Sequence, residues 1–304
     1  MGRVTVEVPA TSANLGAGFD CLGLALELCN TVTVEELHGT DIEVTVAGCG
    51  TTELSRGPDN LVLVAMRHLY AKQGRRLPGI RLDQHNGIPL CSGLGSSAAA
   101  EISGLTAANV LLGEPFTARD LALIALELEN HPDNIMPALL GGLVVAVAQH
   151  RRGGWELAYT RLDPPPLQAV IVTPNLKVET VESRRKLPTR YSRADAVFNI
   201  GRAALLVAAV AQGDWAALAT ALDDRIHQPY RLPAIEGAPE VIAAAKEAGA
   251  IGAVLSGSGP TILALCASGG EAVAEAVAAK WREFGVGVNA QVLATRAVGA
   301  RVVA

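Results

Sequence analysis

A run of glycines and serines that leads directly into a long alanine-rich stretch constrains this chain more than any other feature. Residues 88–100 read IPLCSGLGSSAAA, and helical spacing continues over residues 96–112. Gly93 and Gly95 allow the backbone to approach an anion closely. The first turn of the helix adds unpaired N–H groups and about half a positive charge. The segment therefore predicts a phosphate-binding loop at a helix N-terminus.

The same loop excludes two well-known nucleotide folds. It has no lysine of the Walker type, and its glycines lack the spacing of a dinucleotide fingerprint. Ser96 and Ser97 add hydroxyls within reach of a phosphate or its magnesium. On its own, the segment also fits a flexible turn with Ser96 as an ordinary helix cap.

Strand-like and helix-like patterns alternate along the whole chain, so we expect a mixed α and β protein. The expected strands are 31–36, 42–47, 143–148, 168–173, 261–265 and 289–295, and the expected helices are 60–70 (capped by Asp59), 96–112, 118–130, 194–212, 214–227, 239–248 and 271–284. Polar, glycine and proline residues punctuate residues 150–166. We place a domain boundary there, with domains at 1–153 and 154–304.

Composition narrows the class of protein. The chain has 304 residues, 50% hydrophobic and 18% charged, which is typical of a globular protein, and its net charge of -5 disfavours nucleic acid as a partner. The longest Gly-free apolar run, residues 203–211, is less than half of the roughly 20 residues that a membrane helix needs. We therefore expect no membrane segment, a cytoplasmic location and five reduced cysteines.

Two further clusters of small residues accompany the loop. Residues 255–261 read LSGSGPT, which alone fits a tight turn between strands. Residues 9–23 read PATSANLGAGFDCLG and combine hydroxyls, an amide and a carboxylate directly after a first strand-like stretch, in which Val4, Val6 and Val8 alternate with polar residues. A segment of that kind is suited to gripping a small polar ligand.

In this order and at these separations, the three clusters resemble the signature motifs of the kinase superfamily named for galactokinase, homoserine kinase, mevalonate kinase and phosphomevalonate kinase (GHMP). Residues 9–24, 131–134 (HPDN) with 137–142, and 227–231 (HQPYR) are similar to segments of its homoserine kinases. The resemblance spans residues 6–265. It implies an α+β fold of two domains, the first like ribosomal protein S5 domain 2 and the second ferredoxin-like.

The resemblance also implies an activity: ATP-dependent, magnesium-assisted phosphorylation of the side-chain hydroxyl of L-homoserine to O-phospho-L-homoserine, a step towards threonine. A homodimer is a further expectation from the family. The residues implied to bind ATP are Pro89, Leu90, Cys91, Ser92, Gly93, Leu94, Gly95, Ser96, Ser97, Ala98 and Ala99. Ser97 and Glu129 match the positions expected near magnesium. Glu127 lies two residues away and stays open as an alternative to Glu129.

A homoserine site needs arginine for the carboxylate, an acid for the ammonium and neutral hydrogen-bonding groups. The candidates are Arg231 and one of Arg184 and Arg185 for the carboxylate, Asp20 for the ammonium, and Asn14, His131, Asn134 and Thr180 for the remainder. The catalytic set implied is Asn14, Asn134, Glu129 and Ser97. Without the resemblance, most of these residues also fit solvated charges or helix starts.

The sequence departs from the superfamily pattern at two places, of which the second concerns the substrate. Cys91 stands where the superfamily usually has Gly, Ala, Ser or Thr, a small change. Residues 9–20 hold no lysine, unlike mevalonate-kinase-like relatives, which favours homoserine over mevalonate. The general base stays open, with Asp133 nearby. The alternatives are a related kinase for an isoprenoid alcohol or a sugar, and a catalytically silent ligand-binding relative.

Overall fold

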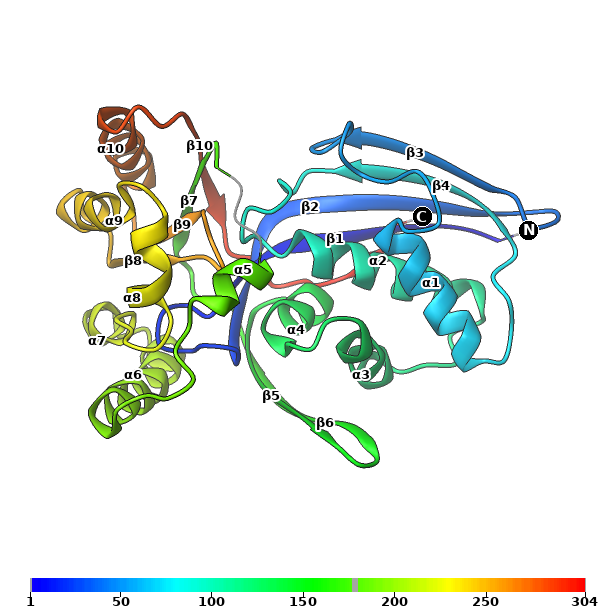
Figure 1. Ribbon diagram of the computed structural model, residues 1–304, viewed down its shortest axis with the longest axis horizontal. Helices are drawn as coiled ribbons and strands as arrows, with labels where there is room; N and C mark the ends of the chain where they lie inside the picture. The colour runs from blue at the N-terminus through cyan, green and yellow to red at the C-terminus, as the bar shows by residue number, and fades with distance from the viewer. Residues whose placement is uncertain (1, 177–179, 304) are drawn as a thin grey trace.

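The computed structural model describes residues 2–176 and 180–303, which form two sheets with helices packed against them (Figure 1). The seven-stranded sheet contains β1 (Arg3–Ala13), β2 (Leu22–Leu37), β3 (Ile42–Gly48), β4 (Gly79–Asn86), β5 (Leu143–Arg151), β6 (Gly154–Leu162) and β11 (Arg301–Val302). Its order is β11-β1-β2-β4-β3, and β5 pairs with both β2 and β6. β3 and β4 are parallel, and α1 (Leu61–Lys72) connects them.

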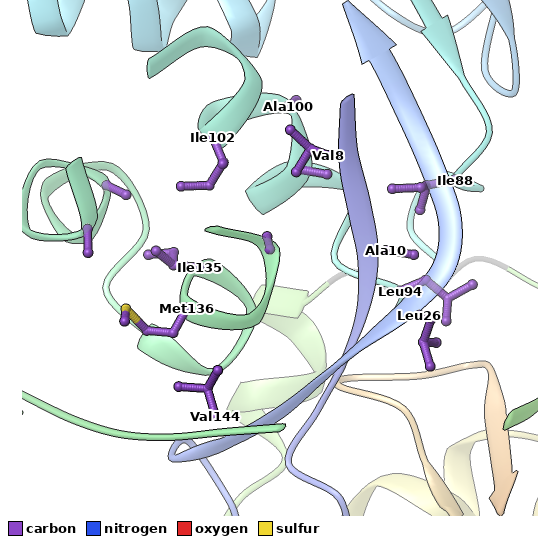
Figure 2. Packing of buried hydrophobic residues seen from close by; sticks show 14 of the residues in the cluster. Val8, Ala10, Leu26, Ile88, Leu94, Ala100, Ile102, Ile135, Met136 and Val144 are labelled. Carbon is purple, nitrogen blue, oxygen red and sulfur yellow. The ribbon is translucent and has the colours of Figure 1, made fainter. Parts of the chain in front are cut away.

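Four helices lie on one side of this sheet: α1, α2 (Ser96–Leu111), α3 (Ala118–Leu128) and α4 (Pro132–Leu140) (Figure 1). The alternation of β1 explains this layer, because Val4, Val6 and Val8 are buried in the main core. Figure 2 shows Val8 beside Ala100 of α2. The alanine-rich sequence of α2 lets it pack closely against both the strand and the neighbouring helices.

The second sheet is antiparallel, in the order β10-β7-β9-β8, with β7 (Gln168–Pro174), β8 (Gly252–Leu255), β9 (Ile262–Cys266) and β10 (Val288–Ala294). Both of its faces are covered. In β7, Ala169 and Ile171 belong to the main core, whereas Val170 and Val172 belong to a second core. The second core lies under α9 (Ala238–Glu247) and α10 (Gly270–Glu283). The expected α+β fold with a ferredoxin-like second sheet is confirmed.

The division of the chain at residue 153 stays a prediction. Two strands that follow this residue, β6 and β11, belong to the first sheet: β6 pairs with β5 along its whole length, and β11 pairs with β1. The last described strand, β11, thus returns to the sheet that contains β1.

Two expected helix boundaries were wrong. α1 is capped by Asn60, whose side chain accepts a hydrogen bond from the N–H of Val62; the predicted cap, Asp59, instead accepts one from Ser55. The helix predicted at 214–227 ends early, as α7 (Trp215–Ala221). After α7, the carboxylate of Asp224 accepts hydrogen bonds from the backbone N–H groups of residues 226–228. These bonds hold the chain in a turn that leads into α8 (Gln228–Arg231).

The helix α6 (Arg193–Gln212) is the single candidate for a membrane span among the described residues, by length and composition only. Its best window has a mean hydropathy of 1.6, and 17% of that window is buried. A search for uninterrupted apolar runs misses it because Gly201 and Arg202 divide the helix. In the structure Leu206 and Ala209 belong to the main core, so α6 packs as an element of the fold.

Two helical glycines provide a test of this packing. A Cβ added to Gly104 of α2 would lie 2.3 Å from the carbonyl oxygen of Val62 in α1, whereas a Cβ on Gly201 of α6 would meet nothing within 4 Å. Gly104→Ala should therefore lower the free energy of unfolding by about 1–3 kcal/mol. Gly201→Ala should raise it by about 0.5–1 kcal/mol. Urea unfolding of both variants measures these changes, and a Gly104→Ala protein as stable as Gly201→Ala would contradict the close contact of α1 and α2.

Candidate active site

The predicted phosphate loop joins β4 to α2, and its glycines are required by close neighbours. Gly93 and Gly95 have φ of +83° and +69°. A Cβ on Gly93 would lie 2.2 Å from the carbonyl oxygen of Ser256, and a Cβ on Gly95 would lie 2.0 Å from Oγ1 of Thr11. Side chains are therefore excluded at both positions, and the N-terminus of α2 stays open to a ligand.

The three clusters of small residues meet at this loop. The hydroxyl of Ser256 donates to the carbonyl oxygen of Gly93 at 2.7 Å, and the N–H of Thr11 donates to the carbonyl oxygen of Leu94 at 3.1 Å. The 255–261 segment does join two strands, β8 and β9, as a tight turn would. It also supports the phosphate loop, which sequence spacing alone could not reveal.

A cavity of about 130 Å³ opens in front of the loop. The predicted site residues that line it are Asn14, Asp20, Cys91, Ser92, Gly93, Gly95, Ser96, Ser97, Ala98, Glu129, His131, Asn134, Arg184 and Arg231. Pro89, Leu90, Leu94, Ala99 and Arg185 do not line it. The side chain of Thr180, which begins α5 (Thr180–Arg185), lies outside the described residues.

A second cavity of about 190 Å³ adjoins the same loop and shares Cys91, Ser96 and Ser97 with the first. Apolar side chains line it together with three amides: Leu54, Leu61, Leu90, Asn60, Gln84 and Asn86. The amides form a chain, because Asn60 donates to Gln84 at 3.1 Å and Gln84 donates to Asn86 at 2.9 Å. A cavity lined by apolar side chains and a few hydrogen-bonding amides suits a flat, nitrogen-rich ring.

Two arginines face one end of the first cavity. Arg184 binds both carboxylate oxygens of Asp20, at 3.0 and 2.6 Å, and Arg231 donates to the carbonyl oxygen of Gly257 at 3.1 Å. The Nε atoms of both arginines are buried and have no hydrogen-bond partner. Buried donors without partners are uncommon, so this end of the cavity is prepared for an anion. Arg185 is exposed and away from the cavity.

Asn14 has a role that the sequence did not suggest. Its Oδ1 accepts the backbone N–H of Asp20 at 3.0 Å, and its Nδ2 donates to the carbonyl oxygen of Gly257 at 3.0 Å. The amide therefore holds the 14–20 loop against the 255–261 turn. This fixes the position of Asp20 at the edge of the cavity.

The two glutamates that the sequence left open differ sharply. Glu127 is half-exposed, forms an ion pair with Lys72 at 2.6 Å and shares a hydrogen bond with Nε2 of His68 at 2.7 Å. Glu129 lines the cavity, and its Oε2 is buried without a partner. Burial, together with the charge of Glu101, raises the pKa of Glu129 to about 8. Of the two, Glu129 is thus the carboxylate available to a ligand.

Asp133, His131 and Asn134 occupy the start of α4. Burial raises the pKa of Asp133 to about 7, with Asp20 and Glu129 adding to the effect, and burial lowers the pKa of His131. The hydroxyl of Thr11, a residue that the sequence analysis did not single out, donates to Oδ1 of Asn134 at 2.7 Å. Its only sequence signal was its place in the 9–23 cluster.

The buried carboxyl of Asp133 predicts a dependence of stability on pH. Because its pKa is raised in the folded state, its stabilising contribution is complete below the unfolded pKa near 3.8 and is lost as pH rises through about 7. Asp133→Asn should therefore reduce the loss of unfolding free energy between pH 5 and 7, by up to about 1.4 kcal/mol per pH unit. Denaturation of the ligand-free protein over this range measures it. Equal slopes for the two proteins would show that Asp133 does not titrate there.

Comparisons with known proteins show the family to which the chain belongs. The chain matches the family models "GHMP kinases N terminal domain" over residues 60–142 and "GHMP kinases C terminal" over residues 206–287. It is 43% identical to a homoserine kinase of Synechococcus sp., over 99% of this chain and 98% of the relative, and 44% identical to one of Moorella thermoacetica, over 98% and 99%.

Solved structures agree as well. A homoserine kinase from Cytophaga hutchinsonii superposes with a TM-score of 0.89 at 30% identity, covering 100% of this chain and 98% of that one. A mevalonate kinase structure superposes with a TM-score of 0.70 at 13% identity, covering 96% and 99%, which is a likeness of fold alone. The chain belongs to the GHMP kinase family, and within it to the homoserine kinases.

Proposed function

We propose that this chain transfers the γ-phosphoryl group of ATP to the side-chain hydroxyl of L-homoserine and forms O-phospho-L-homoserine, a step towards threonine. One observation carries the proposal: a single cavity joins a phosphate-binding helix N-terminus to a carboxylate and to two arginines with unpaired buried donors. Relatives that share more than 40% of its residues over almost the whole chain bear the name homoserine kinase.

The nucleotide occupies both cavities in this proposal. The backbone N–H groups of residues 93–97 and the dipole of α2 hold the phosphates, because no lysine is present in the loop to share their charge. The second cavity, with its chain of amides and its leucines, takes the base. Cys91 stands between the two cavities and fits a small position beside the phosphates.

Ser97 and Glu129 fit a magnesium ion, because Glu129 has a buried carboxylate oxygen without a partner and Ser97, which carries a hydroxyl, lines the same cavity. Hard oxygen ligands of this kind suit Mg²⁺, which when bound neutralises charge on the phosphate oxygens. Glu127 is already paired with Lys72 and His68 and does not line the cavity.

The other end of the cavity matches an amino-acid zwitterion. Asp20 accepts the ammonium, and the free Nε atoms of Arg231 and Arg184 donate to the carboxylate. The existing pair of Asp20 with Arg184 holds both groups in place before substrate arrives. Burial lowers the pKa of His131 and so favours its neutral form, which supplies a hydrogen bond without adding charge. Transfer through a loose transition state then relies mainly on positioning and charge stabilisation.

An isoprenoid alcohol or a sugar is the competing substrate class, because the fold is shared with mevalonate kinase. Neither substrate has an ammonium for Asp20 to bind, and a sugar has no carboxylate for the arginines. A cytoplasmic location and a homodimer belong to the same proposal. Val197 and Ile200 of α6, which are 63% and 69% exposed, support the homodimer as an apolar surface for a second copy.

Release of ADP in the presence of ATP and magnesium tests the function across L-homoserine, 4-hydroxybutyrate, mevalonate, shikimate and galactose. L-homoserine should give the highest kcat/KM, and a higher value for mevalonate or galactose would overturn the proposal. Asp20→Asn should raise the KM for L-homoserine and narrow its advantage over 4-hydroxybutyrate, which lacks the amine. Discrimination that survives Asp20→Asn would mean that other residues bind the ammonium.

Substitutions of Glu129 and Glu127 provide a matched pair of variants that tests which carboxylate binds magnesium. Glu129→Gln should lower kcat strongly at limiting Mg²⁺ and recover part of it at high Mg²⁺, because one ligand is lost. Glu127→Gln, two residues away, should keep wild-type Mg²⁺ dependence and lose only a surface ion pair worth about 0–1 kcal/mol. The reverse result, with Glu127→Gln dependent on high Mg²⁺, would place the metal at the other carboxylate.

A further inference from the structure

Thr11 connects the phosphate loop to the substrate side of the site without lining the cavity. It is fully buried near the end of β1. Its N–H donates to the carbonyl oxygen of Leu94 in the phosphate loop at 3.1 Å, and its Oγ1 donates to Oδ1 of Asn134 on α4 at 2.7 Å. Asn134 lines the cavity, whereas Thr11 does not. One residue therefore fixes two parts of the site relative to each other.

The hydrogen bond from Thr11 determines which atom of the Asn134 side-chain amide is available to the cavity. An asparagine side chain has one acceptor, Oδ1, and one double donor, Nδ2. Oδ1 already accepts the proton of Thr11, and among the residues that the structure describes none bonds to Nδ2 of Asn134. Asn134 thus offers the cavity a donor. It can stabilise an oxygen that carries negative charge, and an amide is too weakly basic to take up the proton of the substrate hydroxyl.

The side chains of Thr11 and Asn134 pack closely against the backbone of residue 95. A Cβ on residue 95 would lie 2.0 Å from Oγ1 of Thr11 and 3.1 Å from Oδ1 of Asn134. The hydroxyl therefore has room only because residue 95 is glycine, the residue that caps α2 at the phosphate loop. The glycine, the threonine and the amide form one packed unit behind the reacting groups.

We propose that Thr11 is a positioning residue for phosphoryl transfer, whose hydroxyl holds the Asn134 amide with Nδ2 available to the reacting oxygens. The inference rests on the proposed function, because it names the residue that orients a group of the same site. Without the hydroxyl, the amide is free to turn and present Oδ1. An acceptor then faces oxygens that gain negative charge, and the transition state loses a hydrogen bond.

Substitutions that separate shape from hydrogen bonding test this role. Thr11→Val keeps the shape and removes the donor, so kcat should fall by about 10- to 100-fold, while KM for ATP and for L-homoserine changes less than about threefold. Thr11→Ser keeps the hydroxyl and should retain kcat within about threefold. Thermal unfolding checks each variant, and Thr11→Cys, with a weak donor of similar size, replaces valine if the valine protein does not fold.

A double-mutant cycle with Asn134→Ala completes the test. In that background Thr11→Val should change kcat by less than about threefold, because no amide is left to orient. The role of Thr11 is overturned by an equal loss in both backgrounds, by an unchanged kcat in Thr11→Val, or by a serine variant as slow as the valine one. The wild-type rate with L-homoserine tests the proposed function separately, since the ratios between variants hold for whichever alcohol the chain phosphorylates.

Discussion

The close approach of two backbone segments, the 92–95 loop and the 255–261 turn, is the contact on which the site depends. The carbonyl oxygen of Ser256 lies where a side chain of residue 93 would begin, and the Ser256 hydroxyl donates to the carbonyl oxygen of Gly93. One segment belongs to the first domain and the other joins two strands of the second sheet. The cavity therefore exists only when both sheets are folded and in contact.

Charge is distributed unevenly along the cavity. Among the described residues that line the cavity, one end offers backbone N–H groups at the start of α2 and no positively charged side chain, and the other end concentrates Arg184 and Arg231 beside Asp20. Between them, Glu129 and Asp133 are buried carboxyls whose pKa values are raised by burial. Such groups are costly unless a ligand or a proton compensates them, which is typical of functional sites.

Much of this arrangement could be predicted from the sequence, because each motif is a continuous segment with its own local chemistry. The loop before α2 and the family resemblance located most of the residues that line the cavity. Contacts between segments far apart in the sequence could not be predicted in this way. They pair Glu127 with Lys72 and leave Glu129 at the cavity. They also place Arg184 rather than Arg185 at the cavity and bond Thr11 to Asn134. β4 escaped detection because Gln84 and Asn86 are buried at positions where a strand pattern expects apolar residues.

A crystal structure of the chain with L-homoserine and a non-hydrolysable ATP analogue tests most directly whether this cavity holds the phosphates and the amino acid together. We expect phosphates on the backbone N–H groups of residues 93–97, the ammonium at Asp20, the carboxylate at Nε of Arg231, and the hydroxyl beside Nδ2 of Asn134. A homoserine carboxylate bound away from both Arg231 and Arg184, or phosphates bound outside the 93–97 loop, would contradict it.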